Sequence, residues 1–317
     1  MRKLSLLLAT VLVATFTNAQ LTGTKNIPGD YATLALAITD LNTVGVGAGG
    51  VTINVIAGNP ETAPNGTGYY ITATGTVANP IIFQGNGNTI TAGLNTAGGN
   101  VDAVFKIVGG DYITIQNFVI QENSGNTVTA TGATNTMTEA GVLLIHASAT
   151  DGAQNNTIQN NTISLNAAYP NAVGILSTSS TTTTNASPGA NTSADATSTA
   201  GTNSNNQVFG NTISAVAYGV YFICPPVTAT VFETGNNIGG SSGATGNTIT
   251  FGNATPTTGP WNRSFTTSHA GIAFRNGAGN SVRFNTITSG SLTYTGTGGV
   301  YGVLVSSGTA PSGVTYT

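Results

Sequence analysis

Hydrophobic and polar residues alternate along most of the chain in short runs that are separated by glycine and asparagine. In the segment 51–58, VTINVIAG, Val51 and Ile53 alternate with polar residues, which is the two-residue period of a half-buried β-strand. Similar runs within 81–93 and 105–123 are bounded by residues typical of tight turns. The pattern predicts many short strands joined by small polar turns.

One segment near the start has the period of a helix instead. Leu34, Ile38 and Leu41 recur at i, i+4 and i+7, and Asp30 precedes them as a candidate N-cap. The sequence therefore predicts an amphipathic helix over 31–42 that is ended by a glycine-rich run. No second helix is evident from the pattern.

Two phrases repeat in alternation from residue 141 onward. One phrase is a glycine followed by alternating apolar residues, and it begins at Gly141, Gly174, Gly219, Gly271 and Gly302. The other phrase is Asn-Thr-Ile, and it begins at Asn161, Asn211, Asn247 and Asn285, with a further copy at Asn156. The order is constant but the spacing is not, which is typical of solenoid coils with loops of variable length.

The period of each phrase predicts which side chains face inward. In the glycine phrase, the residues one and three places after glycine share one face of a strand, and Ser177 interrupts their column. The inward residues predicted in this way are Val142, Leu144, Val220, Phe222, Ile272, Phe274, Val303 and Val305. In the other phrase, the isoleucines point inward and the threonines outward, and the predicted core includes Ile163, Ile213, Ile249 and Ile287.

The asparagines that open the Asn-Thr-Ile phrases sit where the chain must turn. Asparagine tolerates left-handed backbone angles, and its amide can bond the backbone of the turn. If Asn161, Asn211, Asn247 and Asn285 stack, their amides form a ladder, and the alternative is a set of ordinary turn asparagines. Under either interpretation the repetition is architectural.

The composition agrees with a β-rich chain and limits the kinds of molecule that the protein is expected to bind. Only 5% of the 317 residues are charged, whereas 39% are hydrophobic, and the chain contains 43 glycines. Thr, Asn, Ser and Gly must therefore form most of the solvent-exposed polar surface. The net charge of −3 gives no basic footprint, which argues against a nucleic-acid partner.

The N-terminus has the features of a signal peptide over 1–20. Arg2 and Lys3 precede an apolar run that is too short for a membrane span, and small residues follow it. The sequence predicts a secreted or surface-attached protein with no membrane span. Cys224 is the only cysteine, so no internal disulfide can form.

The segment 30–61, DYATLALAITDLNTVGVGAGGVTINVIAGNPE, resembles the N-terminal cap of right-handed parallel β-helix proteins of the pectin-lyase-like superfamily. The sequence also resembles those of large surface proteins of Bacteroidetes that the type IX system exports. The resemblance implies an all-β fold, a right-handed parallel β-helix with an N-terminal capping helix. Its expected parts are a cap over 21–50 and the β-helix over 51–317. The fifth glycine phrase, at Gly302, is not followed by an Asn-Thr-Ile phrase, so the sequence is expected to be a fragment of a longer protein.

The fold does not fix an activity, because it carries lyases, hydrolases, adhesins and inert stalks. The paired aspartates and the Gly-His-Gly phrase of the family's polygalacturonases are absent. A lyase would need a base, for which Arg275, Arg283 and Lys106 are candidates, and a bound Ca²⁺; the alternative for the two arginines is a solvated surface. No spacing of His, Cys and Asp predicts a metal site, and no cofactor is expected.

Two insertions interrupt the repeats. The polar run 177–206 lacks Val, Ile, Leu, Phe and Met, and it is expected to be a mobile loop that cannot pack. The insertion 251–269 holds Trp261 and Arg263, which can form a sugar-stacking platform or simply anchor the loop.

Together these patterns predict a structural or adhesive module on the cell surface, without catalysis of its own, that binds an extracellular polysaccharide or other surface proteins. The alternative is a polysaccharide lyase or glycoside hydrolase that acts on acidic polysaccharide. An ice-binding solenoid is disfavoured, because the threonines are spaced irregularly along the sequence rather than as a flat repeated array.

Overall fold

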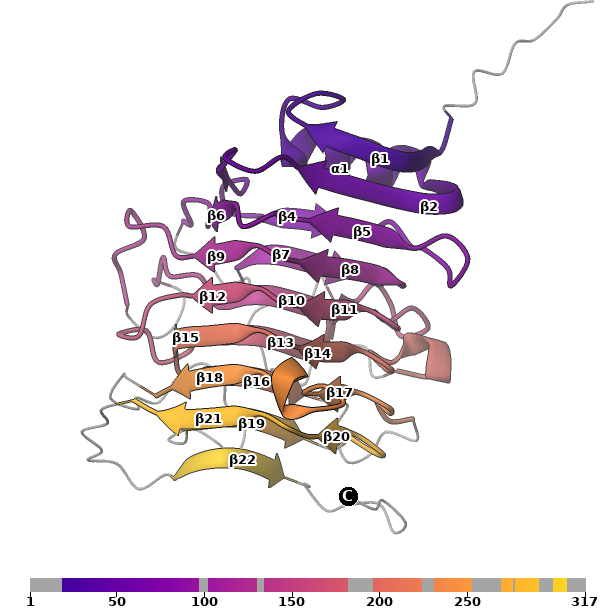
Figure 1. The fold of residues 1–317 in the computed structure, drawn as a ribbon. Helices are drawn as coiled ribbons and strands as arrows, with labels where there is room; N and C mark the ends of the chain where they lie inside the picture. Colours follow the sequence, from indigo (N-terminus) through magenta and orange to yellow (C-terminus); the bar gives the residue numbers. More distant parts are fainter. Residues whose placement is uncertain are drawn as a thin grey trace, which may run out of the picture.

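The structure is a computed structural model that describes residues 19–96, 102–129, 134–181, 196–223, 231–252, 269–275, 277–290 and 299–306. Its strands form three parallel sheets that run along the molecule (Figure 1). From the second strand onward, successive strands join sheet A, then sheet B, then sheet C, and the next strand returns to sheet A beside its predecessor. This order confirms three parallel sheets of short strands and is consistent with a parallel β-helix.

Sheet A contains, in spatial order, β1 (Leu21–Ile27), β2 (Val46–Val55), β5 (Ile81–Gln84), β8 (Ile113–Gln116), β11 (Thr157–Gln159), β14 (Gln207–Phe209), β17 (Asn237–Ile238) and β20 (Ser281–Val282). Sheet B contains β3 (Glu61–Thr62), β6 (Thr89–Thr91), β9 (Val119–Gln121), β12 (Thr162–Ser164), β15 (Thr212–Val216), β18 (Thr248–Phe251) and β21 (Thr286–Ser289). Sheet C contains β4 (Tyr69–Ile71), β7 (Ala103–Val108), β10 (Ala140–His146), β13 (Val173–Thr181), β16 (Tyr218–Ile223), β19 (His269–Arg275) and β22 (Val300–Ser306). The helical segments are α1 (Leu34–Val44) and two single turns, η1 (Thr199–Gly201) and η2 (Gly243–Thr245).

The glycine phrases stack in the register that their period predicts. Val142 pairs with Ile175, which pairs with Val220, and the column continues to Ile272. The predicted core residues that are at most 3% exposed are Val142, Leu144, Val220, Phe222, Ile272, Phe274, Ile163, Ile213 and Ile249.

The core prediction is wrong at the last coil. Ile287 is only half-buried, and Val303 and Val305 are 44% and 45% exposed. They lie in β21 and β22, the last described strands of their sheets, so no further described coil covers them.

The two repeated phrases pack directly against each other. A Cβ atom at Gly219 would lie 2.3 Å from Cγ2 of Ile249 and 2.4 Å from the carbonyl oxygen of Gly271. The equivalent glycines Gly141, Gly174 and Gly271 meet the isoleucines of the following phrases in the same way. Glycine is therefore required because the isoleucine methyl occupies the space that a side chain would take.

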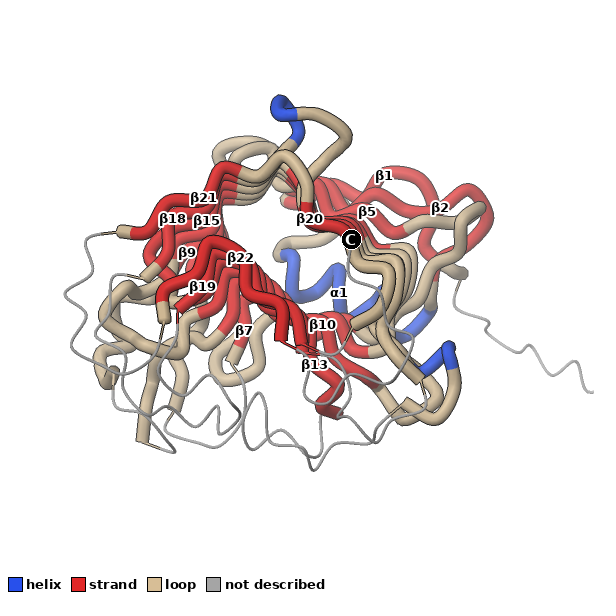
Figure 2. Tube along the Cα trace, turned by 90° about the horizontal axis from the view of Figure 1, so that it is seen from below, coloured by secondary structure: helices blue, strands red, loops and turns tan. Residues whose placement is uncertain are grey.

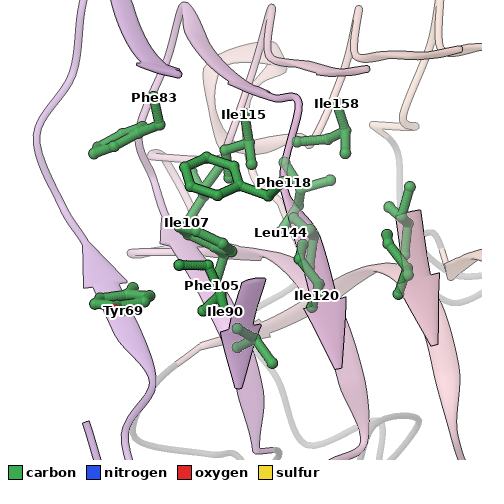
Figure 3. Packing of buried hydrophobic residues seen from close by; sticks show 14 of the residues in the cluster. Tyr69, Phe83, Ile90, Phe105, Ile107, Ile115, Phe118, Ile120, Leu144 and Ile158 are labelled. Carbon is green, nitrogen blue, oxygen red and sulfur yellow. The ribbon is translucent and has the colours of Figure 1, made fainter. Parts of the chain in front are cut away.

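Aromatic rings fill the interior of the early coils (Figure 3). The ring of Phe105 lies between those of Tyr69 and Phe118, with centroid separations of 5.2 and 5.3 Å. These separations are typical of favourable aromatic pairs, so the interior is packed rather than hollow.

Helix α1 begins three residues later than predicted. Its N-cap is Thr33, whose hydroxyl accepts a hydrogen bond from the Leu36 amide at 3.3 Å, and not Asp30. Asp30 instead accepts the amide of Asn26 at 2.7 Å. The apolar side of α1 joins the main core through Leu34, Ala37, Ile38 and Leu41.

Side-chain hydrogen bonds join α1 to sheets B and C. The amide of Leu34 donates to Oε1 of Glu61 in β3 at 2.9 Å. The side chain of Asn42 donates to the carbonyl oxygen of Tyr70 at 2.8 Å and accepts the amide of Thr72 at 2.9 Å. Viewed along the axis, α1 lies in line with the space between the sheets (Figure 2). In the described part of the chain, no helix has both the length and the apolar character needed to cross a membrane.

Sheet C is apolar on its outer face as well as on its inner face. Leu143, Ile145, Leu176, Tyr221 and Ala273 form a second buried cluster that is separate from the interior one. The phrase GVLLIH is thus a strand buried on both faces rather than an alternating one.

The prediction of a mobile polar loop over 177–206 is wrong at both ends. Ser177 and Thr178 lie in β13 and are buried. Asn203 is also buried, and its amide donates to the hydroxyl of Ser177 at 3.1 Å and to the carbonyl oxygen of Thr178 at 3.0 Å. Hydrogen bonding between buried polar groups substitutes here for the missing apolar residues. Residues 182–195 lie outside the described part.

Candidate functional site

The asparagines of the Asn-Thr-Ile phrases lie in one column at the entry to sheet B. The side-chain amide of Asn161 donates to Oδ1 of Asn211 at 3.1 Å, Asn211 donates to Asn247 at 3.0 Å, and Asn247 donates to Asn285 at 2.8 Å. Oδ1 of Asn211, Asn247 and Asn285 each also accepts the backbone amide of the preceding asparagine in the column, at 3.0 to 3.1 Å. The first three asparagines are 1% exposed, so these bonds hold the coils in register inside the protein.

A second asparagine column lies at the entry to sheet A, where the sequence interpretation did not place one. The backbone amides of Asn156, Asn206 and Asn236 donate to Oδ1 of Asn206, Asn236 and Asn280, respectively, at 2.8 to 3.0 Å. The residue before each of these asparagines has a positive φ angle. The doublets Asn155-Asn156 and Asn205-Asn206 were the signal for this column in the sequence.

Lys106 and Arg275, two of the three candidate bases, lie on strands that are not neighbours. Lys106 is in β7 and Arg275 ends β19, and the strands β10, β13 and β16 lie between them in sheet C. Arg283 is exposed in the turn after β20. For Arg275 only the backbone is described, and Trp261, Arg263 and Cys224 lie outside the described residues.

Lys106 instead belongs to a buried group of ionisable side chains at the corner between sheets B and C. Glu139 precedes β10, and its carboxylate accepts the amide of Asp102 at 2.8 Å and the hydroxyl of Tyr169 at 2.7 Å. Lys106 and Glu139 are 6% and 4% exposed. We refer to Asp102, Lys106, Glu139 and Tyr169 as the corner cluster.

Burial dominates the proton equilibria of the corner cluster. It raises the pKa of Glu139 to about 8, with a further contribution from the nearby charge of Asp102. Burial also raises the pKa of Asp102 to about 7, while the Lys106 ammonium opposes this shift. The pKa of Lys106 is lowered by burial, against the attraction of both carboxylates. The cluster can exchange protons near neutral pH, and Glu139 and Lys106 are almost fully buried.

Outside the corner cluster, the described acid with a clear pKa shift nearest to it in the chain is Asp111, which lies near Asp151. Asp111 has a pKa raised to about 6 by burial, and its carboxylate accepts the amide of Gln154 at 2.7 Å. Across the described ranges, no three side chains of His, Cys, Asp or Glu gather closely enough to hold a metal ion.

The outer face of sheet B carries hydroxyl side chains in a regular array. Thr162, Thr212, Thr248 and Thr286 pair in unbroken register across four neighbouring strands, and all four are exposed. Each is followed by an inward isoleucine and then by a second outward hydroxyl. The second column contains the residues Ser164, Ser214, Thr250 and Thr288. We call these eight residues the hydroxyl face.

The second column is less regular than the first. Ser164 pairs with Ser214, and Thr250 pairs with Thr288, but a bulge at Ala215 separates the two pairs. Thr288 is exposed, and the other three are half-buried. Within the described part of the chain, no hydroxyl of the hydroxyl face makes a side-chain hydrogen bond, so all eight can bond to a ligand or to water.

The sequence interpretation placed these threonines outward but judged their spacing irregular. The insertions between phrases vary in length, whereas the pairing of the strands does not, and the array is regular only in space. Comparisons with models of known families, with curated proteins and with solved structures found no match. The expected superfamily and bacterial group therefore gain no support from relatives.

Proposed function

We propose that this chain is an exported structural or adhesive module that acts by binding through its hydroxyl face and not by catalysis. The observation that carries the proposal is the register of Thr162, Thr212, Thr248 and Thr286 across four strands. A surface with a repeating set of donors and acceptors suits a ligand whose own surface repeats, because each added contact uses the same geometry.

The interior supports a mechanical role. The asparagine column and the isoleucines beneath it fix each strand of the hydroxyl face from below. A right-handed tube closed by α1 is the form that we propose for the whole module, and the bonds from Leu34 and Asn42 to β3 and to the β4 segment support the closure. A rigid array loses little conformational entropy when it binds.

The proposal is tested by co-sedimentation of the purified chain with insoluble particles, including ice, cellulose, chitin and acidic polysaccharide gels. The double variant Thr212→Lys/Thr248→Lys places two long charged side chains on the hydroxyl face. Its matched control is Thr157→Lys/Thr114→Lys on the outer face of sheet A, where both threonines are half-buried. Binding of the wild type that only the first variant loses supports the proposal, and binding that neither variant changes contradicts it.

A second candidate is proton-transfer chemistry on an acidic polysaccharide. The corner cluster favours it, because a lysine of lowered pKa lies near carboxylic acids of raised pKa. The test is incubation with polygalacturonate and alginate in the presence of Ca²⁺, followed by the absorbance of unsaturated sugar products. Product formation that Lys106→Met abolishes would replace the binding proposal with an enzymatic one, and the absence of product with the wild type would remove this candidate.

A further inference from the structure

The side chains of the hydroxyl face are spaced at two regular intervals, one between neighbouring strands and one along each strand. Neighbouring strands of a sheet lie about 4.8 Å apart, and residues i and i+2 of one strand lie about 6.6 Å apart. Thr248 and Thr250 on β18 and Thr286 and Thr288 on β21 form one complete cell of such a lattice. The pairs on β12 and β15 form a second cell beside it.

Each threonine of the first column is held in place by its backbone and its own shape. The amides of Thr212, Thr248 and Thr286 each donate at 2.8 Å to the carbonyl oxygen of the asparagine in the preceding coil. The side chain of threonine is branched at Cβ, which restricts its χ1 angle. The hydroxyl and methyl groups are therefore presented in a fixed pattern rather than as a flexible surface.

The chemistry of the eight side chains points to ordered water rather than to a sugar. Proteins hold the apolar faces of sugar rings by stacking aromatic side chains on them, and none of the eight is aromatic. None is charged, and a charge would impose its own hydration geometry on the first water layer. What remains is the regular column of threonine methyl groups at Thr162, Thr212, Thr248 and Thr286, which favours an ordered water layer, and hydroxyls that can anchor it.

We propose that the hydroxyl face binds the surface of ice crystals. A regular column of hydroxyl and methyl groups can order the adjacent water, and such a layer can then join the crystal. This inference rests on the proposed function of the hydroxyl face and adds its ligand. Ice binding is disfavoured by the irregular spacing of the threonines along the sequence, whereas the register of the strands favours it.

The neighbouring strand β9 offers a gain-of-function test. Its outward residues Val119 and Gln121 pair with Thr162 and Ser164 and are the first interruption of the array toward the N-terminus. Beyond them, β6 again carries Thr89 and Thr91 in register. The double variant Val119→Thr/Gln121→Thr would extend the array from four strands to six without touching the interior.

The experiment measures how the full chain partitions between slowly growing ice and the remaining liquid, together with its effect on ice recrystallisation. We expect enrichment of the wild type in ice, loss of enrichment in Thr212→Lys/Thr248→Lys, no change in Thr157→Lys/Thr114→Lys, and a several-fold gain in Val119→Thr/Gln121→Thr. Circular dichroism and thermal unfolding verify that each variant is folded. If the lysine variant does not fold, Thr212→Ser/Thr248→Ser, which removes only two methyl groups, should still reduce the enrichment.

The outcomes separate this inference from the proposed function. Exclusion of the wild type from growing ice, or equal effects of the two lysine variants, would overturn the inference. If the wild type is excluded from ice but binds an insoluble polysaccharide through the hydroxyl face, the proposed function stands and its ligand is a sugar polymer. If it binds no particle, both fail.

Discussion

The asparagine column provides the sharpest test of how the coils are held together, and Asn211 is its central member. The Asn211 amide nitrogen donates to the carbonyl oxygen of Ile158 at 2.8 Å, to that of Phe209 at 3.1 Å and to Oδ1 of Asn247 at 3.0 Å. Its Oδ1 accepts both the backbone amide and the side-chain amide of Asn161, at 3.0 and 3.1 Å. Replacement by alanine removes all five bonds.

The expected cost follows from the groups left behind. The backbone amide of Asn161 loses its acceptor in a site that is 1% exposed, and the carbonyl oxygen of Ile158 loses a donor. A buried polar group left unpaired costs about 1–3 kcal/mol, so Asn211→Ala should lower the free energy of unfolding by about 2–4 kcal/mol. Urea denaturation followed by circular dichroism measures this difference.

Two further variants control the experiment. The exposed neighbour Thr212 makes no side-chain hydrogen bond to the described residues, so Thr212→Ala should change the stability by no more than about 0.5 kcal/mol. Asn211→Asp keeps the shape but places a carboxylate oxygen against two carbonyl oxygens, and it should destabilise the protein at neutral pH at least as much as alanine does. If Asn211→Ala proves as harmless as Thr212→Ala, the amides do not hold the coils and the reasoning is refuted.

Three further predictions concern packing and protonation. Phe222→Ala should cost about 3–5 kcal/mol in urea denaturation, because Phe222 is fully buried and contacts the ring of Phe274, and a loss below about 1 kcal/mol would contradict its place in the core. Gly219→Ala should cost about 1–3 kcal/mol or more in the same assay, while Gly243→Ala, where no atom lies within 4 Å of the new Cβ, should be nearly neutral. Burial raises the pKa of Glu139 from 4.5 to about 8, so the folded state binds more protons in that window, and the stability of the wild type should fall relative to Glu139→Gln as the pH rises through it. Unfolding curves of both proteins at several pH values measure this difference, and a difference that stays constant with pH would show that folding does not change the pKa of Glu139.

The parallel sheets and most of the core could be predicted because both depend on local period. Val142 and Leu144 share a strand face by their spacing alone, and the repeated glycines show that equivalent strands stack. The prediction failed at the last coil because a side chain is buried only if a further coil packs over it. Val303 lies in the last described strand of its sheet and has no described coil above it.

Features that depend on the pairing of distant strands could not be predicted in the same way. The corner cluster joins Asp102, Glu139 and Tyr169 from three different coils, and no local spacing connects them. The outward direction of each threonine of the hydroxyl face was predicted correctly, but the regularity of the array was not. The loops between the strands differ in length, so the regular register of the strands is not visible in the sequence. The buried outer face of sheet C was missed because a continuous apolar run was interpreted as an alternating one.

Both the fold and the proposed function depend on one claim, that the threonines of sheet B face outward while the isoleucines beside them face the core. Thiol labelling tests it directly in a Cys224→Ser background, with single cysteines introduced at Thr212 and at Ile213 in β15. Thr212 is exposed and Ile213 is 1% exposed, so the cysteine of Thr212→Cys should react in the native protein at the rate of a free thiol, and that of Ile213→Cys only after unfolding. Equal rates at the two positions, or the reverse order, would contradict the account.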